Sequence, residues 1–207
     1  MARYALALAM SLACSTSVFA QTAAAPAPSE NGDKKAEKWD VNAPPGMTTR
    51  KVSIAVDEGS WMNVDVAPDG RTIAFDLLGD IYTMPIEGGT PTRIAEGLAY
   101  EHQPRFSPDG GRIAFVSDRG GGDNIWLMNR DGSGKIQLSK EDFRLLNQPS
   151  WSPDGQFIVA KKHFTTGRSL GTGEVWMYHV SGGAGVPLVK KASERLQKEL
   201  GEPIFAA

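Results

Sequence analysis

Residues 104–115 read PRFSPDGGRIAF, and this string decides the fold. Pro108 presets the backbone at the second position of a tight turn, the Asp109 side chain bonds the backbone that follows, and Gly110 accepts the positive φ that sends the chain back. Apolar residues alternate on both sides of the turn. The string therefore predicts two antiparallel strands joined by a Pro-Asp-Gly turn.

The same pattern occurs three times along the chain. Residues 64–75 read VDVAPDGRTIAF and residues 149–160 read PSWSPDGQFIVA, so the turn prolines are spaced by 40 and 45 residues. A third strand is expected after each turn, and a fourth is expected after the glycine turn that follows. The expected third strands are residues 80–84, 124–128 and 174–178, and the expected fourth strands are residues 93–94, 136–138 and 186–188.

Four short strands in a period of about 40 residues are typical of a β-propeller blade. The sequence thus predicts an all-β fold, an incomplete β-propeller over residues 51–207 with about three four-stranded antiparallel blades. A β-sandwich with coincidental turns is the alternative. Trp126, Trp151 and Trp176 are expected to pack between blades.

Both ends of this region suggest parts of further blades. Residues 201–207 resemble the start of another repeat, and residues 51–56 resemble a fourth strand that lacks a blade of its own. Residues 192–200 have some helical character. We therefore expect a fragment of a longer propeller, with missing C-terminal blades as its partners.

The first 20 residues resemble a secretory signal peptide. Arg3 precedes an apolar run at residues 4–13, and Val18 and Ala20 fit a cleavage site near Ala20. The run is too short to span a bilayer, so no membrane span is expected and the mature protein is predicted to be periplasmic or secreted. A buried helix is the alternative for this segment.

Two further features of the N-terminal region complete this interpretation. Cys14 is the only cysteine, and Leu12 and Ala13 before it loosely resemble a lipobox. Ser11 stands where that motif prefers leucine, which argues against a lipoprotein. Residues 21–50 are rich in alanine, proline and polar side chains, and they are predicted to form a flexible linker.

Charge and motifs exclude several classes of function. The formal net charge is −2, which predicts no nucleic-acid partner. Neither a Gly-x-Ser-x-Gly elbow nor a phosphate-binding Gly-x-x-x-x-Gly-Lys loop occurs. His102, His163 and His179 are the three histidines, and no two of them form the His-x-His pair that opens many metal-dependent hydrolase sites. We predict no catalytic residue, no metal ligand and no cofactor within this chain.

Three residues are candidates for a binding site. Glu101 and His102 precede the innermost strand of the second blade, and Arg119 follows the second strand of that blade. In a propeller these positions lie near the mouth of the central channel, where a protein or peptide ligand is a possible partner. An ion pair between Asp118 and Arg119 that braces the loop is the structural alternative.

Longer strings carry a family resemblance. The Ser-Pro-Asp-Gly turns and the sequence Ser117-Asp118-Arg119 resemble the WD-like propeller repeats of TolB-type proteins. Residues 74–82, AFDLLGDIY, and residues 168–178, RSLGTGEVWMY, resemble blades of exported bacterial amidohydrolases that begin with a TolB-like propeller.

This resemblance implies a parent protein that hydrolyses amide or cyclic-amide bonds with a divalent metal such as zinc. The present chain would be its non-catalytic propeller portion, which gates or supports a hydrolase domain that follows. Two alternatives stay open: a periplasmic TolB-like protein–protein interaction module, and the propeller cap of a serine peptidase. In each case any enzyme activity belongs to the longer protein.

Overall fold

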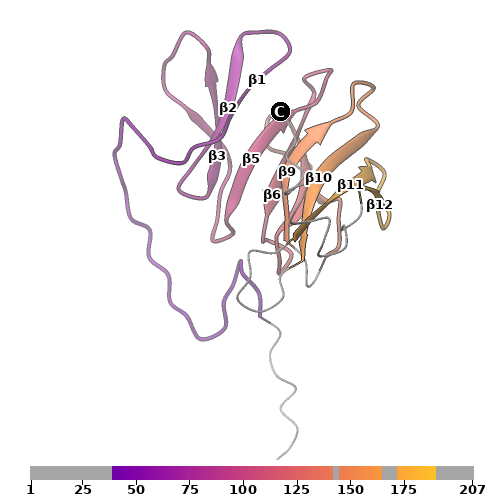
Figure 1. Ribbon diagram of the computed structural model, residues 1–207. Helices are drawn as coiled ribbons and strands as arrows, with labels where there is room; N and C mark the ends of the chain where they lie inside the picture. Colours follow the sequence, from indigo (N-terminus) through magenta and orange to yellow (C-terminus); the bar gives the residue numbers. More distant parts are fainter. Residues whose placement is uncertain (1–38, 142–144, 165–171, 190–207) are drawn as a thin grey trace, which may run out of the picture. The chain divides into compact units, whose positions relative to one another are not determined.

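A computed structural model describes residues 39–141, 145–164 and 172–189 (Figure 1). Within these residues the regular structure is entirely β, in three four-stranded antiparallel sheets. The first sheet contains β1 (Val64–Val66), β2 (Thr72–Leu77), β3 (Asp80–Pro85) and β4 (Thr92–Ala95). The second contains β5 (Glu101–Phe106), β6 (Arg112–Ser117), β7 (Asn124–Asn129) and β8 (Ile136–Gln137). The third contains β9 (Leu145–Trp151), β10 (Phe157–Phe164), β11 (Thr172–His179) and β12 (Val186–Val189).

Strand order within each sheet follows chain order, so each sheet is one simple meander. The predicted third strands lie within β3, β7 and β11, and the predicted fourth strands coincide with β4, β8 and β12 to within one or two residues. The predicted all-β fold with three blades of an incomplete propeller is confirmed. No helix in the described part of the chain is long and apolar enough to cross a membrane.

One pattern of hydrogen bonds closes the turn between β5 and β6. The Gly110 amide donates to the Ser107 carbonyl at 2.8 Å, and Gly110 has a φ of 69°. Asp109 Oδ1 accepts from the Gly111 amide at 3.0 Å and from the Ser107 hydroxyl. The Ser107 hydroxyl also accepts the Arg112 amide at 2.9 Å. The matching glycines in the other two turns are Gly70, with a φ of 66°, and Gly155, with a φ of 68°.

The apolar core lies between the sheets. Side chains of the first and second sheets form one cluster, which contains Ala67, Ala74, Ile81, Ala95, Phe106, Ile113, Phe115 and Met128. Side chains of the second and third sheets form another, which contains Ala114, Val116, Ile125, Leu127, Leu138, Leu146, Ile158, Ala160 and Tyr178. Trp126, Trp151 and Trp176 pack against these clusters, as predicted.

Polar contacts align the first strands of neighbouring sheets, where β1 lies beside β5 and β5 lies beside β9. Asp65 Oδ2 accepts the Phe106 amide at 2.7 Å. The Trp151 indole Nε1–H donates to the Arg105 carbonyl at 3.0 Å. Each bond joins a side chain of one sheet to the backbone of the next, so the inner edges hold a fixed mutual position.

Asp76 is the buried carboxylate at the junction of the first two sheets, with 6% of its surface exposed. It accepts the amide of Gln103 at 2.7 Å, and the amide and side-chain nitrogen of Asn63 at 2.8 Å each. Gln103 has a φ of 55°, and β5 bulges there against β6. Gln148, with a φ of 53°, occupies the matching bulge in β9 and donates its amide to the Gln103 carboxamide oxygen at 2.6 Å.

The outer edges of the first two sheets also meet. Lys135 Nζ donates to the Ile94 carbonyl at 3.0 Å. A Cβ added to Gly132 would collide with that same carbonyl oxygen. The glycine in the turn between β7 and β8 is therefore required for the second sheet to approach the backbone of β4.

The strand expected at residues 51–56 is not present. These residues are exposed and make no ladder. An extended segment gains strand geometry only when its amides and carbonyls pair with a sheet edge, and in the described chain residues 51–56 pair with none. The expectations for residues 192–200 and 201–207 lie outside the described residues, as do those for the signal peptide.

The hydroxyl of Ser107 is expected to stabilise its turn measurably. Ser107→Ala removes bonds from a side chain that is 1% exposed, and Ala67 shows that alanine fits the matching backbone of the first turn. We expect a loss of about 1 kcal/mol in the free energy of unfolding by urea titration. If the loss instead falls within error of zero, the hydroxyl is not a stabilising element.

Ser107→Ala is also expected to change the pKa of Asp109. The Ser107 hydroxyl and the Gly111 amide hold the pKa of Asp109 below its ordinary 3.8. The carboxylate form is favoured by folding, so this contribution is complete above pH 3.8 and is lost as the pH falls through the lowered folded pKa. Ser107→Ala should raise the folded pKa of Asp109, measured by NMR titration, and Ser152→Ala should do the same at Asp154.

The carboxylate of Asp76 is expected to contribute more than an exposed ion pair. Asp76→Asn replaces one acceptor oxygen with an NH₂ group, which then faces one of the three N–H donors and cannot accept its hydrogen bond. We expect the free energy of unfolding, measured by urea titration, to fall by about 2 kcal/mol. Asp80→Asn is the control, because Asp80 pairs with a half-exposed Arg93 at 3.1 Å. That loss should stay below about 1 kcal/mol. Equal losses in the two variants would contradict this role of Asp76.

Candidate functional site

Glu101 and Arg119 form an ion pair where β5 begins and β6 ends. The register pairs Glu101 with Ser117, which places Arg119 just beyond the strand. Arg119 Nε donates to Glu101 Oε1 at 2.9 Å, and Arg119 Nη2 contacts the same oxygen. Glu101 is fully buried, whereas the Arg119 side chain is 24% exposed. Glu101 thus holds the guanidinium, whose Nη2 also donates to the Glu96 carbonyl at 3.3 Å, while part of the arginine side chain remains exposed.

The environment of Glu101 is strongly desolvated. Burial raises its pKa, and the hydrogen bond and charge of Arg119 oppose that rise. Glu101 Oε2 is buried and has no hydrogen-bond partner among the described residues. An unpaired Glu101 carboxylate would be costly here, so the position of Arg119 is tightly coupled to the fold.

The alternative prediction of an ion pair between Asp118 and Arg119 is wrong. Asp118 Oδ1 instead accepts the Tyr100 amide at 2.8 Å, which joins the β6–β7 connection to the chain that enters β5. Arg119 turns to Glu101, 18 residues earlier. The carboxylate that orients the arginine is therefore one of the predicted site residues.

His102, the third predicted residue, is half-buried and points to different neighbours. Its ring lies 5.1 Å from that of Tyr100. Burial lowers the pKa of His102, and the charges of Asp123, Asp76 and Asp118 partly oppose this effect. The structure brings the side chains of Glu101 and Arg119 together, whereas the His102 ring contacts Tyr100.

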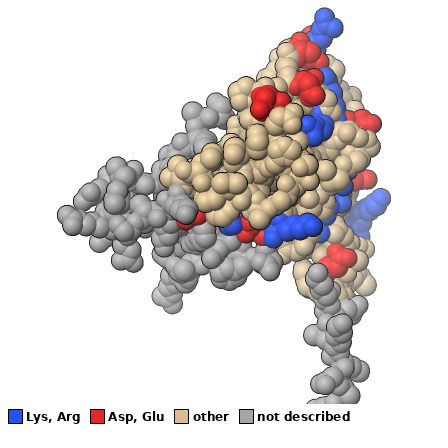
Figure 2. Space-filling view, turned by 90° about the vertical axis from the view of Figure 1, so that its right-hand side faces the viewer, with Lys and Arg blue, Asp and Glu red and all other residues tan. Residues whose placement is uncertain are grey.

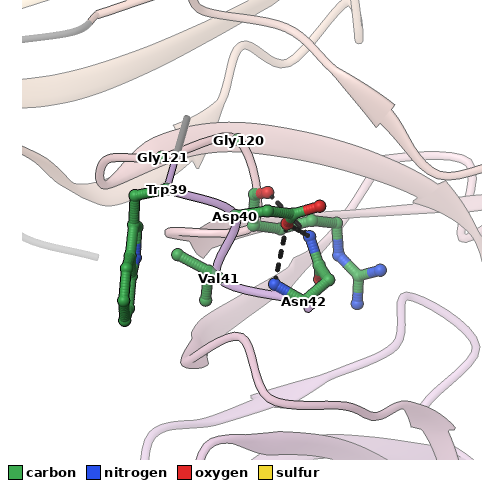
Figure 3. A pocket seen from close by; sticks show the side chains of 7 residues that line it. Trp39, Asp40, Val41, Asn42, Gly120 and Gly121 are labelled. Carbon is green, nitrogen blue, oxygen red and sulfur yellow. Dashed lines mark hydrogen bonds between the residues drawn. The ribbon is translucent and has the colours of Figure 1, made fainter. Parts of the chain in front are cut away.

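A surface pocket lies beside Arg119. It is lined by Trp39, Asp40, Val41, Asn42, Arg119, Gly120 and Gly121. Figure 3 shows the turn at residues 39–42 against the Gly120–Gly121 loop, with the Trp39 ring projecting away from Asn42. Asn42 Nδ2 donates to the Arg119 carbonyl at 3.0 Å and to Asp40 Oδ1 at 3.1 Å.

The pocket combines a fixed cation, an aromatic face and a glycine loop. Trp39 is 59% exposed, so its ring is open to a ligand. None of the lining residues is a serine, cysteine or histidine. Among the described residues no group of three or more His, Cys, Asp or Glu side chains is placed to hold a metal ion. The arrangement suits binding through charge and stacking.

Sequence reasoning placed Trp39 to Asn42 in the linker and did not assign them to the site. The available signal was a lone tryptophan next to two residues that favour turns, Asp40 and Asn42. Their contact with residue 119 spans 77 positions, and such a contact leaves no periodic trace in the sequence.

Comparison with known proteins agrees with this architecture. The chain is 39% identical to Uncharacterized protein Atu1656 of Agrobacterium fabrum over 97 residues. This aligned region covers 45% of the present chain and 33% of that protein. Over 115 residues it is 28% identical to Uncharacterized peptidase YuxL of Bacillus subtilis, covering 50% of this chain and 17% of that one. The chain therefore spans a third or less of these curated relatives.

A solved structure gives the same result. The putative TolB from Agrobacterium tumefaciens superposes with a TM-score of 0.52 at 30% identity, over 59% of this chain and 47% of that chain. The family model for the TolB beta propeller domain, PD40, matches residues 46–179, which include all three turns and most of the three sheets. The chain belongs to the TolB beta propeller domain family.

Proposed function

We propose that this chain is a non-catalytic recognition module of an exported protein, and that it binds a peptide segment of a protein partner. Membership of the TolB beta propeller family supports the module. The observation that carries the binding role is a surface pocket lined both by Arg119, which buried Glu101 holds, and by the exposed Trp39. Export rests on the signal-like residues 1–20.

The chemistry of the pocket favours an acidic peptide. The Arg119 side chain is partly exposed and can donate to a carboxylate of a ligand, and Glu101 already holds its guanidinium in place. The Trp39 ring offers a flat apolar surface to a neighbouring aromatic or aliphatic side chain. Gly120 and Gly121 carry no side chains to keep a peptide backbone away. A short segment that places an acidic residue next to an aromatic one fits these features.

The module has two candidate settings within a longer protein. The likeness to a bacterial peptidase favours the propeller cap of a serine peptidase, which guides peptides toward a separate active site. An amidohydrolase parent has no support from the relatives described above, and no residue of this chain is proposed to hold its zinc. Genomic sequence beyond codon 207 distinguishes the settings, since a Gly-x-Ser-x-Gly elbow indicates a peptidase and a His-x-His pair indicates an amidohydrolase.

The peptide site can be tested with a defined probe. We expect the capped tetrapeptide Asp-Phe-Asp-Gly to shift the backbone amide signals of Gly120 and Gly121 in NMR titrations of the full chain. The analogue with asparagine in place of aspartate should bind at least fivefold more weakly. Trp39→Ala should weaken binding by a similar factor, because it removes the stacking surface.

Matched variants separate this site from general effects. Trp61→Ala is the control, since Trp61 is 98% exposed and does not line the pocket. Arg119→Lys keeps a positive charge beside Glu101 but loses the planar guanidinium. Its affinity for the peptide should therefore lie between those of the wild type and Trp39→Ala. Absence of shifts at Gly120 and Gly121, or equal binding by the two tryptophan variants, would refute the proposed site.

A further inference from the structure

The ion pair between Glu101 and Arg119 is one-sided, because it satisfies a single carboxylate oxygen. Arg119 Nε and Nη2 both contact Glu101 Oε1, whereas Glu101 Oε2 is buried and accepts no hydrogen bond from the described residues. The Glu101 side chain is fully inaccessible to solvent. A buried carboxylate with donors on only one oxygen keeps part of its charge uncompensated. This geometry stabilises the ionised form less than a pair that engages both oxygens would.

The nearest second cation does not supply the missing donor. Lys135, between β7 and β8, directs its ammonium group to the backbone carbonyls of Ile94 and Gly132, at 3.0 Å and 2.6 Å. Its charge acts on Glu101 through space. The ammonium hydrogens of Lys135 are thus used to hold the outer edges of the first two sheets together.

The remaining charge near Glu101 is negative. Asp80 of β3 faces the same region and pairs with Arg93 at 3.1 Å. Burial raises the pKa of Glu101 above its ordinary 4.5 and Asp80 adds to this rise, whereas Arg119 and Lys135 oppose it. Glu101 is therefore a carboxylate that can take up a proton at a pH where exposed carboxylates stay ionised.

The charge that Arg119 presents to a ligand depends on Glu101. The Arg119 side chain bonds the described residues through Nε and Nη2, which reach Glu101 and the Glu96 carbonyl. Nη1 is the nitrogen that these bonds leave for a carboxylate of a ligand. An ionised Glu101 cancels the charge of the guanidinium, whereas a neutral Glu101 leaves a full positive charge at the pocket.

The surface charge of the chain does not override this local pair. On the side shown in Figure 2, Lys and Arg side chains lie among Asp and Glu side chains, and neither sign forms a broad patch among the described residues. The formal net charge of the chain is only −2. A mixed surface of this kind gives a weak net field, so the charge state of Glu101 decides the local attraction for an anion.

We propose that Glu101 takes up a proton when an acidic ligand binds Arg119, so that mild acid strengthens binding at this pocket. The inference rests on the proposed function and assigns a regulation to the same site. A proton from solvent joins Glu101 Oε2 and converts the carboxylate to a carboxylic acid, while Oε1 still accepts from Arg119. The ligand carboxylate then replaces Glu101 as the counter-ion of Arg119. By linkage, a ligand that favours the protonated form binds more tightly as the pH falls.

The sign and the range of the effect follow from the groups involved. The negative charge of a bound ligand raises the pKa of Glu101 further, because it disfavours a second carboxylate beside Arg119. Aspartate carboxylates of a peptide titrate near 3.9, so they remain ionised above about pH 5. If binding raises the pKa of Glu101 by about one unit, the affinity below both pKa values is about tenfold the affinity above both.

Isothermal titration calorimetry of the capped peptide Asp-Phe-Asp-Gly on the full chain tests the proposal. We expect binding to be about fivefold tighter at about pH 5.5 than at about pH 8, since the lower value need not lie below both pKa values. Binding at the lower pH should take up protons, which is measured from the binding enthalpy in buffers of different ionisation heat.

Matched variants identify the group that titrates. Glu101→Gln keeps an oxygen for Arg119 and resembles the neutral acid, so its affinity should match the low-pH affinity of the wild type at both pH values. His102→Gln and Asp123→Asn are the controls, because burial lowers the pKa of His102 and raises the pKa of Asp123. Both controls should keep the pH dependence and the proton uptake of the wild type.

The ¹³C signal of the Glu101 carboxyl group gives a readout that does not depend on any variant folding. Its titration midpoint in the wild-type chain should rise by about one pH unit when the peptide saturates the site. Equal affinity at the two pH values with an unmoved midpoint would overturn the proton linkage and leave the peptide site intact. Absence of binding at both pH values would overturn the peptide site and the linkage with it.

Discussion

Face-to-face contact between neighbouring sheets is the interaction on which this structure depends. A single four-stranded sheet has two faces and no interior, so it cannot bury its own apolar side chains. Both apolar clusters accordingly lie between sheets, one at each junction. The turns and ladders shape each sheet, but the burial that stabilises a sheet is supplied by its neighbour. The Pro-Asp-Gly turns matter because they give the first two strands of every sheet the same pairing. The faces of successive sheets therefore stay complementary.

Polar bonds make each junction specific. Apolar packing alone tolerates a shift of one sheet along another, whereas the bonds from Asp76 to Gln103 and from Gln103 to Gln148 permit one alignment. The left-handed backbone at the two glutamines turns their amides out of their own ladders and toward the preceding sheet. The same inner edge carries the bond from Trp151 to Arg105. Specificity is therefore concentrated where the first strands meet.

The repeated elements of the fold were predictable from sequence because they are local. Proline, aspartate and glycine act on their own turn, and the short apolar runs at residues 73–75 and 113–115 identify strands that are buried. The strand at residues 51–56 was predicted wrongly, since likeness to a fourth strand does not supply a sheet edge. The pairing of Arg119 with Glu101 could not be read from the sequence, where the adjacent Asp118 was the simpler partner.

The Trp151 indole has a consequence for how the protein can be observed. Its N–H is committed to a carbonyl of the adjacent sheet, so its exchange with solvent deuterium requires those sheets to separate at the inner edge. Backbone amides inside β10 require the third sheet itself to come apart. The difference between these two exchange rates separates hinge-like parting of sheets from melting of a sheet. The exchange of this one indole proton thus reports how often the second and third sheets separate while each stays folded.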